Sequence, residues 1–320
     1  MRRFFRYLVA AAMVLTGFSA CTVDEESDDD GDYGAGYRAA KSDSSMTAEK
    51  VFEYMPAPGQ FINEGFDVTT MAAACSYAEG RLAQQYYVSL GGWGGYIVVG
   101  FDHSIPNKSG YDLRIRSNAI DNSSEPGIVW VMQDSNGNGF PDDTWYELAG
   151  SGYGTDKRRA NYSVTYYRPS STGQPVEWRD VDGTEGEIDY IAAEHSQDYY
   201  YPAWITADSY TLSGTCVEAR NYDQSGNGSY WVQAEYEWGY ADNFSNIDRL
   251  SDEGNSNASA NANYFKISNA IDSNGKSIHL KYIDFIKVQT ACNTKSGWLG
   301  ENSTEIFGFF DYSITKEQSK

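Results

Sequence analysis

Residues 91–150 read GGWGGYIVVGFDHSIPNKSGYDLRIRSNAIDNSSEPGIVWVMQDSNGNGFPDDTWYELAG, and this stretch decides the fold class. It contains three short runs rich in β-branched and aromatic residues, Tyr96–Phe101, Tyr111–Arg116 and Ile128–Gln133. Gly, Pro and Asn separate these runs, which is the pattern of strands joined by turns. The stretch therefore predicts consecutive β-strands with no helix between them.

Further runs of the same kind continue to the end of the chain. They are Asn161–Tyr167, Ser229–Tyr236, Asn263–Ser268, Tyr282–Gln289 and Glu305–Tyr312. Many short strands without intervening helical patterns predict an all-β protein, a two-sheet β-sandwich of the jelly-roll or galactose-binding-like type. No repeat of fixed period occurs, which argues against a propeller or a solenoid.

One helix is expected before these strands. Residues 68–85 are rich in alanine and place apolar side chains at steps of three and four residues. This helix is predicted to pack its apolar stripe on the sandwich. We expect a single sandwich domain over residues 49–320, with an irregular insertion around residues 170–201.

The N-terminus has the features of an export signal. Arg2, Arg3 and Arg6 precede an apolar run too short to span a bilayer, and Phe18-Ser19-Ala20-Cys21 follows. These last residues resemble a bacterial lipobox, with Phe18 where Leu is usual. Residues 1–20 are therefore expected to be a lipoprotein signal peptide, with Cys21 lipidated as a membrane anchor. An ordinary signal peptide cleaved nearby is the alternative.

Residues 21–48 are expected to form a disordered acidic tether, because they lack any apolar period. The sequence TVDEESDDDGD directly after Cys21 resembles the acidic signal that sends Bacteroidota lipoproteins to the outer face of the outer membrane. The alternative is a plain solvated linker.

Charge and cysteine content narrow the function classes. The chain carries 45 acidic against 24 basic residues, a net charge of −21, so a nucleic-acid partner is not expected. Cys75, Cys216 and Cys292 remain besides Cys21, which permits at most one disulfide among them. No CxxC motif occurs and the histidines are far apart in sequence, so a zinc site is not expected.

A loop rich in Asp, Asn and Gly follows the third strand of the opening stretch. Its oxygen-bearing candidates for metal ligation are Asp134, Asn136, Asn138, Asp142 and Asp143. Alternating Asp and Asn in a tight loop can direct hard oxygens to one point, which suits Ca²⁺. The first nine positions match the calcium loops of EF-hands, dockerins and thrombospondin type 3 repeats.

The twelfth position of this loop is Trp145 rather than Glu, which excludes a true EF-hand. Glu147 could help to complete the coordination. The alternative is a plain Asn-Gly β-turn that joins two strands. We predict a structural Ca²⁺ as the cofactor.

Aromatic residues beside Asp and Asn suggest a ligand site. The candidates are Trp93, Tyr200, Tyr201, Trp204, Trp238, Tyr240, Asp242 and Asn243. Flat rings supply stacking area, and the polar neighbours supply directional hydrogen bonds. Burial in the core is the alternative for each ring. Catalysis has little support, because a pair of carboxylates such as Glu235 and Glu237 is expected by chance in so acidic a chain.

Four segments carry a family resemblance: VFEYMPAPGQFIN, LGGWGGYIVVGFDHSIPN, EPGIVWVMQDSNGNGFPDDTWYELAGS and IDFIKVQTACNTKSGWLGENSTEI. Together they resemble the "cell surface protein" lipoproteins of gut Bacteroidota, over about residues 50–312. The resemblance implies a jelly-roll sandwich and a locus beside TonB-dependent uptake systems, several of them for corrinoids. It supplies no individual site residues. Cys292 departs from the valine common at its position.

The expected function follows from these features. The resemblance implies an outer-membrane lipoprotein, facing the outside, that captures a corrinoid such as cobalamin for a TonB-dependent transporter. The same aromatic and Asp/Asn residues would serve a glycan-binding module equally well. A glycoside-active enzyme and an adhesive scaffold are further alternatives.

Overall fold

The computed structural model describes residues 33–34, 36–250 and 262–314. The chain divides into two units, Met1–Asp32 and Tyr33–Lys320. The predicted signal peptide and Cys21 lie outside the described residues. Within the described part, no helix combines the length and the apolar character needed to cross a membrane.

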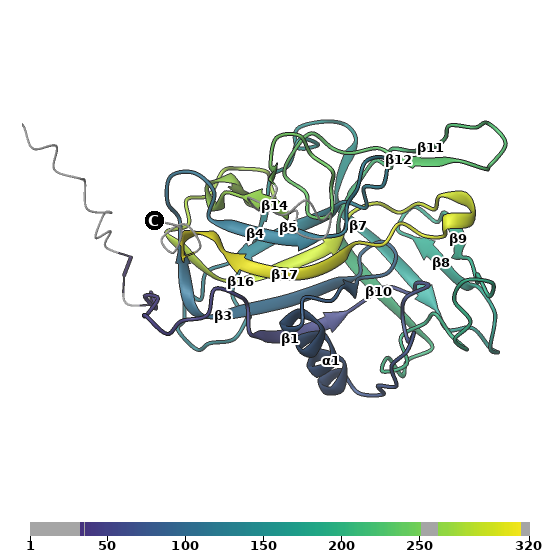
Figure 1. The fold of residues 1–320 in the computed structure, drawn as a ribbon, viewed down its shortest axis with the longest axis horizontal. Helices are drawn as coiled ribbons and strands as arrows, with labels where there is room; N and C mark the ends of the chain where they lie inside the picture. The colour runs from purple at the N-terminus through teal and green to yellow at the C-terminus, as the bar shows by residue number, and fades with distance from the viewer. Residues whose placement is uncertain (1–32, 35, 251–261, 315–320) are drawn as a thin grey trace, which may run out of the picture. The chain divides into compact units, whose positions relative to one another are not determined.

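Two antiparallel sheets form the body of the second unit (Figure 1). The six-stranded sheet has the order β1 (Lys50–Met55), β3 (Tyr96–Pro106), β16 (Tyr282–Thr290), β5 (Gly127–Met132), β6 (Trp145–Leu148), β15 (Ala270–Ile271). The five-stranded sheet has the order β13 (Arg249–Leu250), β14 (Ala262–Phe265), β4 (Leu113–Ser117), β17 (Glu305–Asp311), β2 (Val88–Ser89). The predicted all-β sandwich is confirmed.

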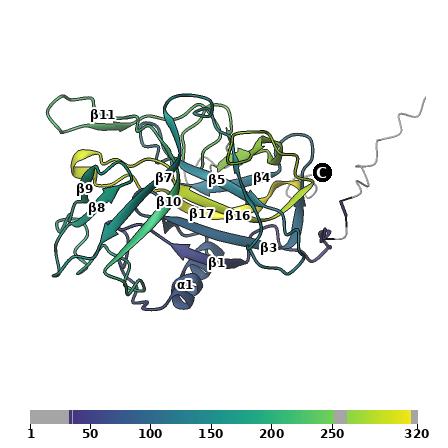
Figure 2. The ribbon, with the colours of Figure 1, turned by 180° about the vertical axis from the view of Figure 1, so that it is seen from behind.

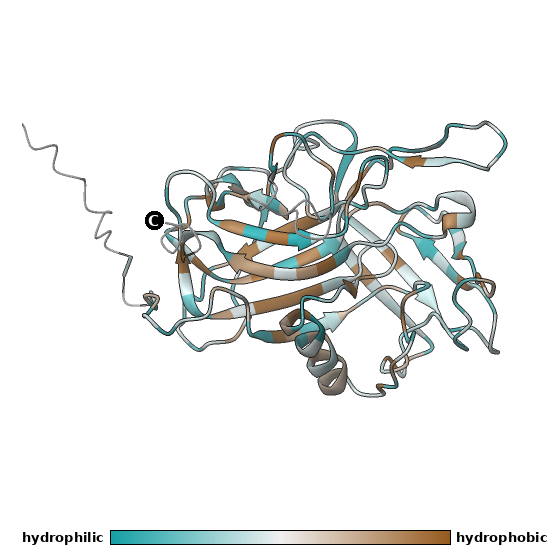
Figure 3. Cartoon of the chain, viewed as in Figure 1, coloured by the Kyte–Doolittle hydropathy of each residue, from teal (hydrophilic) through white to brown (hydrophobic). Residues whose placement is uncertain are grey.

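One hydrophobic core receives side chains from both sheets. Val129 and Ile286 of the six-stranded sheet and Ile115 and Phe309 of the five-stranded sheet belong to it, all essentially without exposed surface. The apolar residues follow the central strands, as the brown colouring in Figure 3 shows. Burying these faces against each other is the main stabilising term for such a fold.

The predicted helix is confirmed as α1 (Met71–Ala83). Thr70 caps its N-terminus by accepting a hydrogen bond from the backbone N–H of Ala73. The helix packs beside β1, where Glu79 accepts a hydrogen bond of 2.9 Å from the backbone N–H of Val51. α1 therefore covers the edge strand β1, whose backbone N–H groups would otherwise be unpaired.

A smaller four-stranded sheet projects from one end of the sandwich (Figure 2). Its order is β10 (Ser209–Val217), β7 (Arg158–Tyr167), β8 (Val176–Asp180), β9 (Glu185–Ile188). The segment predicted as an irregular insertion thus supplies two regular strands, β8 and β9. The remaining elements are the hairpin β11 (Asn221–Asp223) and β12 (Trp231–Gln233), and the 3₁₀ turns η2 (Ile267–Asn269) and η3 (Gly297–Leu299).

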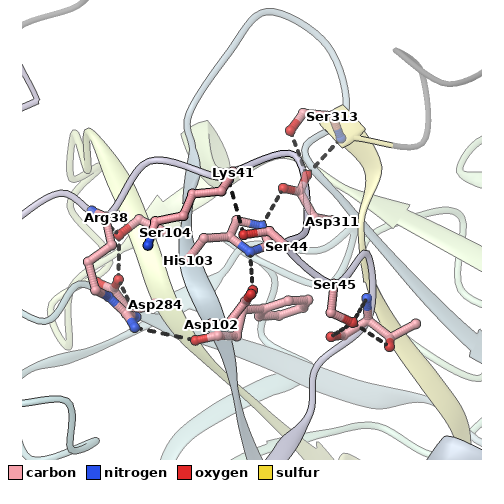
Figure 4. A network of polar contacts seen from close by, with 12 residues as sticks. Arg38, Lys41, Ser44, Ser45, Asp102, His103, Ser104, Asp284, Asp311 and Ser313 are labelled. Carbon is pink, nitrogen blue, oxygen red and sulfur yellow. Dashed lines mark hydrogen bonds and ion pairs between the residues drawn. The ribbon is translucent and has the colours of Figure 1, made fainter.

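The predicted disordered tether is wrong for residues 36–48, which are attached to the sandwich. Arg38 forms an ion pair of 2.9 Å with Asp284, and its backbone exchanges hydrogen bonds with Ser104 (Figure 4). Thr47 bridges to Phe310. Composition alone could not reveal this, because the partners lie far away in sequence.

A buried histidine lies beside this segment (Figure 4). His103 is 1% exposed and contacts Asp102 through Nδ1 at 2.6 Å and Asp311 through Nε2 at 2.9 Å. Burial by itself lowers the pKa of His103, but the hydrogen bonds to Asp311 and Asp102 outweigh it and raise the pKa above its ordinary value. Both ring nitrogens are occupied, so His103 has a structural role.

Candidate functional site

A large cleft lies against the small sheet, and none of the predicted site residues lines it. It has a volume of about 920 Å³, a size typical of small-molecule sites. β8 and β9 form one wall, and residues 293–295 with Glu301 form the other. The two walls lie next to each other in Figure 1, where β9 is beside the loop that precedes β17.

Trp178 supplies the aromatic surface of the cleft. It lies opposite Gly186 in the pairing of β8 with β9. A Cβ atom at Gly186 would come within 2.4 Å of the Trp178 ring, so the indole lies directly across the glycine backbone. Trp178 is half-buried against the core and also lines the cleft, as does the exposed Tyr167. A fixed ring of this kind offers a stacking face at little entropic cost.

Acidic side chains dominate the rest of the lining. Glu177 and Glu187 are directly opposite each other across the strands, an arrangement that is unfavourable for like charges. The two basic residues of the lining both have acidic neighbours: Lys295 contacts both oxygens of Asp189 at 2.9 Å, and Arg179 lies 3.9 Å from Glu185. The cleft is therefore suited to neutral or cationic ligands.

Glu301 is a buried carboxyl group at the wall of the cleft. Its side chain is 3% exposed, and its Oε1 accepts a hydrogen bond of 2.7 Å from the backbone N–H of Gln60. Its Oε2 has no hydrogen-bond partner among the described residues. Burial raises the pKa of Glu301 to about 7. A buried carboxyl group with a raised pKa beside a cleft is typical of functional sites.

The predicted aromatic ligand site is wrong for five of its six rings, because they are buried in packing contacts. Trp93 packs edge-on against Tyr162, Trp204 packs against Tyr54, and Tyr240 packs against Tyr236. The rings that are at most 5% exposed are Trp93, Tyr200, Tyr201, Trp204 and Tyr240. Their apolar surface is more stabilising in the core than in contact with a solvent-exposed ligand.

Trp238 is the sixth predicted ring and remains half-buried. It lines a smaller cavity of about 320 Å³ together with Tyr111, Tyr264 and Asp248. This cavity does not include the other predicted ligand residues. The predicted residues are therefore not brought together into one site.

Asn243 and Asp242 are also buried and were wrongly expected at a ligand surface. The Asn243 side chain donates to the backbone carbonyl of Tyr236 and accepts from its N–H, both at 2.8 Å. The Asn243 side chain thereby pairs the backbone N–H and C=O groups of Tyr236, which lie outside the strands. Asp242 accepts a hydrogen bond of 2.8 Å from the backbone N–H of Glu305.

Asp242 belongs to a carboxylate cluster that the sequence did not indicate. Glu125, Asp242 and Glu305 each place an oxygen within 4.8 Å of the others. Burial, together with the charge of Glu125, raises the pKa of Asp242 and Glu305 well above their ordinary values, and burial also raises that of Glu125. Three such groups can stay together only if they share protons or hold a cation. Hard oxygen ligands of this kind suit a divalent metal.

In the predicted calcium loop, the candidate ligands are close together and bound to one another. Asp134 accepts hydrogen bonds from the backbone N–H groups of Gly137, Asn138 and Gly139. The amides of Asn136 and Asn138 donate to the two oxygens of Asp142 at 3.0 and 2.9 Å. These two amides, Asn138 first, lower the pKa of Asp142.

The remaining candidates of the loop are less favourable for a metal. Asp143 accepts a hydrogen bond from the backbone N–H of Ser135. Glu147 cannot complete the coordination, because both its oxygens bind Arg158, at 2.9 and 2.6 Å. In the part of the chain that the structure describes, the only three acidic, His or Cys residues that converge within 4.8 Å are Glu125, Asp242 and Glu305. A calcium ion in the loop would therefore need the Asn oxygens as ligands.

The cysteines do not form a disulfide in the described structure. Cys75, Cys216 and Cys292 are free thiols. Burial raises the pKa of all three thiols, which makes them poor nucleophiles at neutral pH.

A signal for the cleft was present in the sequence but was weak. The apolar Val176 and Trp178 alternate with the charged Glu177 and Arg179, and Asp182-Gly183 is a hairpin dipeptide. This short polar run was predicted to be irregular. Glu301 carries no sequence signal, because its burial depends on tertiary packing.

No protein-family model matches the chain, and no curated protein matches it.

Proposed function

We propose that the protein is an outer-membrane lipoprotein that binds an extracellular polar nutrient in the cleft between β8, β9 and Glu301. The cleft carries the proposal: it combines about 920 Å³, one stacking ring and an excess of carboxylates. It offers acceptors to a ligand that is rich in hydrogen-bond donors.

A corrinoid such as cobalamin is the first ligand to test. Its ring is large and flat, and its side-chain amides donate hydrogen bonds, which matches Trp178 and the carboxylates of the lining. The resemblance to surface lipoproteins from corrinoid loci favours the same ligand. Delivery to a TonB-dependent transporter is part of this proposal. A glycan is the second candidate, because sugar rings stack on indole faces and donate hydroxyl groups to carboxylates.

Isothermal titration with cyanocobalamin tests the first choice. We expect binding by the wild type and a loss of about tenfold in Trp178→Ala, because a stacked aromatic pair contributes about 0.5–1.5 kcal/mol beyond the area it buries. Trp298→Ala is the matched control, since Trp298 is 60% exposed and does not line the cleft. Thermal melts establish that both variants fold.

A glycan array distinguishes the second candidate. Retention on glycans without any heat on adding cyanocobalamin would replace the corrinoid with a carbohydrate. Absence of both kinds of binding would contradict a capture function.

We also propose that Ca²⁺ stabilises the loop from Asp134 to Asp142. Four oxygen-bearing side chains take part in one hydrogen-bonded loop there, which supports the proposal: Asp134, Asn136, Asn138 and Asp142. The ion would replace the amide donors that now surround Asp142.

A further inference from the structure

Lys287 is a lysine in the middle of the six-stranded sheet. Its neighbours along β16, Ile286 and Val288, belong to the hydrophobic core. Because side chains alternate between the two faces of a strand, Lys287 lies on the face away from that core. There it is directly opposite Val98 of β3 and Trp130 of β5. A long cationic side chain therefore crosses the outer face of the central strands.

Three aromatic rings surround the amine of Lys287. Its Nζ lies 4.7 Å from the ring centroid of Trp130, 5.2 Å from that of Trp145 and 5.7 Å from that of Tyr96. All three distances are within the range of cation–π contacts, about 6 Å. The lysine and the three aromatic residues each keep part of their surface exposed. A small molecule can therefore approach this ring cage from solvent.

The carboxylates near Lys287 are engaged by other groups. Glu53 accepts a hydrogen bond of 2.7 Å from the hydroxyl of Tyr96, and Glu147 binds Arg158 through both oxygens. No ion pair of the described residues involves Lys287. Burial therefore outweighs the charges of Glu53 and Glu147 and lowers the pKa of Lys287 to about 8. Lysines in such apolar surroundings are nucleophiles that form Schiff bases.

We propose that Lys287 is a covalent binding site for neutral aldehydes, which its amine captures as a Schiff base between Tyr96, Trp130 and Trp145. None of these residues lines the cleft beside β8 and β9, so the site is separate from the proposed binding function and goes beyond it.

The capture proceeds by addition and loss of water. The lone pair of Nζ forms a bond to the carbonyl carbon, and the carbonyl oxygen takes the proton that the nitrogen gives up. The resulting hydroxyl group takes one further proton from solvent and leaves as water. The nitrogen lone pair then forms the C=N bond, and the nitrogen of the protonated product carries the positive charge.

The surroundings of Lys287 favour aldehydes over other electrophiles. A protonated Schiff base keeps a positive charge beside the three rings, so the cation–π contacts are retained. Acylation would replace this cation with a neutral amide. An aldehyde that bears a carboxylate would approach Glu53, which has no ion-pair partner among the described residues. A neutral aldehyde avoids this repulsion.

Reductive trapping on the intact protein tests the proposal. Propanal and cyanoborohydride are added at pH 7.5, and peptide mass spectrometry measures the label at each lysine. We expect Lys287 to be labelled at least about tenfold faster than the exposed Lys276, because far more of its amine is neutral at this pH. Glyoxylate, the probe that carries a carboxylate, should label Lys287 at least about tenfold more slowly than propanal.

The pH and the folded state supply two further readouts. The ratio of label on Lys287 to label on Lys276 should fall about tenfold or more from pH 7.5 to pH 9.5, because ordinary lysines, with a pKa of about 10.4, gain more neutral amine over this interval. In protein unfolded with urea the preference for Lys287 should disappear, because the ring cage is lost. Lys287→Met should lose the fast label, and Lys276→Met is the matched control that keeps it.

The outcomes decide between a reactive amine and a structural one. If Lys276 is labelled as fast as Lys287 at pH 7.5, or if the preference persists in urea, the proposed site is refuted. If glyoxylate labels Lys287 as fast as propanal, the restriction to neutral aldehydes is refuted. Each of these results leaves the capture function of the cleft unaffected, because that function is tested by cyanocobalamin and glycans.

Discussion

At the scale of single residues, the glycines of residues 91–95 permit a close crossing of backbones. A Cβ at Gly95 would lie 1.8 Å from the carbonyl oxygen of Leu90 and 2.4 Å from the backbone nitrogen of Ala57. Both atoms belong to backbone that is itself hydrogen-bonded, since Ala57 N–H donates to Leu90. Neither can move without breaking this pairing.

Gly95→Ala is therefore expected to destabilise the protein by at least about 2 kcal/mol, in the range of severe steric substitutions. Gly80→Ala is the control, because Gly80 lies inside α1 with no atom within 4 Å of the added methyl group. It should stabilise the helix by about 0.5–1 kcal/mol. Urea denaturation of both variants measures the difference. A Gly95→Ala variant as stable as the wild type would contradict the close crossing.

His103 makes stability depend on pH at the same scale. Its pKa in the folded state is raised, so its contribution is complete below the unfolded pKa of about 6.5 and disappears as pH rises through the folded value. His103→Asn should therefore lower the melting temperature more at pH 6 than at pH 9. Removing one member of a buried charged pair destabilises by about 3–5 kcal/mol at the lower pH. An equal loss at both pH values would show that the imidazole acts only by packing.

At the scale of elements, the sequence predicted the helix and the central strands, because both follow from the local spacing of apolar residues. Ala74, Ala78 and Leu82 of α1 are buried as their spacing indicated, and the apolar runs became β3, β5 and β16. The aromatic clusters led to a wrong prediction of a ligand site, because the number of rings in a loop does not reveal which side chains pack into the core. Tyr200 and Tyr201 are buried although they lie outside any strand.

The cleft could not be predicted for a related reason. Its two walls are more than a hundred residues apart in sequence, and Glu301 becomes significant only when Gln60 and the small sheet bury it. The cluster of Glu125, Asp242 and Glu305 is likewise assembled from three distant segments. No spacing rule links such residues in a single sequence.

The Asp/Asn loop leads to a prediction about metal binding. In protein treated with EDTA and dialysed, added Ca²⁺ should raise the melting temperature, because a ligand that binds only the folded state stabilises it. Asp142→Asn should abolish this response, since Asp142 is the carboxylate around which the loop amides gather. Asp242→Asn should leave it intact. If Asp242→Asn abolishes the response and Asp142→Asn keeps it, the ion binds at the cluster of Glu125, Asp242 and Glu305 instead. If millimolar Ca²⁺ does not change the melting temperature of the wild type, the loop site is refuted.

At the scale of the whole molecule, the proposed capture function requires that the cleft faces the medium from which the nutrient comes. Residues 36–48 are fixed on the sandwich through Arg38 and Thr47. Fewer residues than predicted therefore remain between Cys21 and the domain. Cys21 itself lies outside the described residues, and its lipidation rests on the sequence.

Replacing Cys21 by Ala should release the protein from the outer-membrane fraction, because the acylated cysteine supplies the proposed anchor. The wild type should label with palmitate and be accessible to protease added to intact cells. Replacing the acidic residues 24–26, 28–30 and 32 by Ala should keep palmitate labelling but abolish protease access, since these residues form the proposed export signal. Palmitate labelling of the Cys21→Ala variant would place the anchor elsewhere, and unchanged protease access of the acidic variant would reduce this segment to a linker.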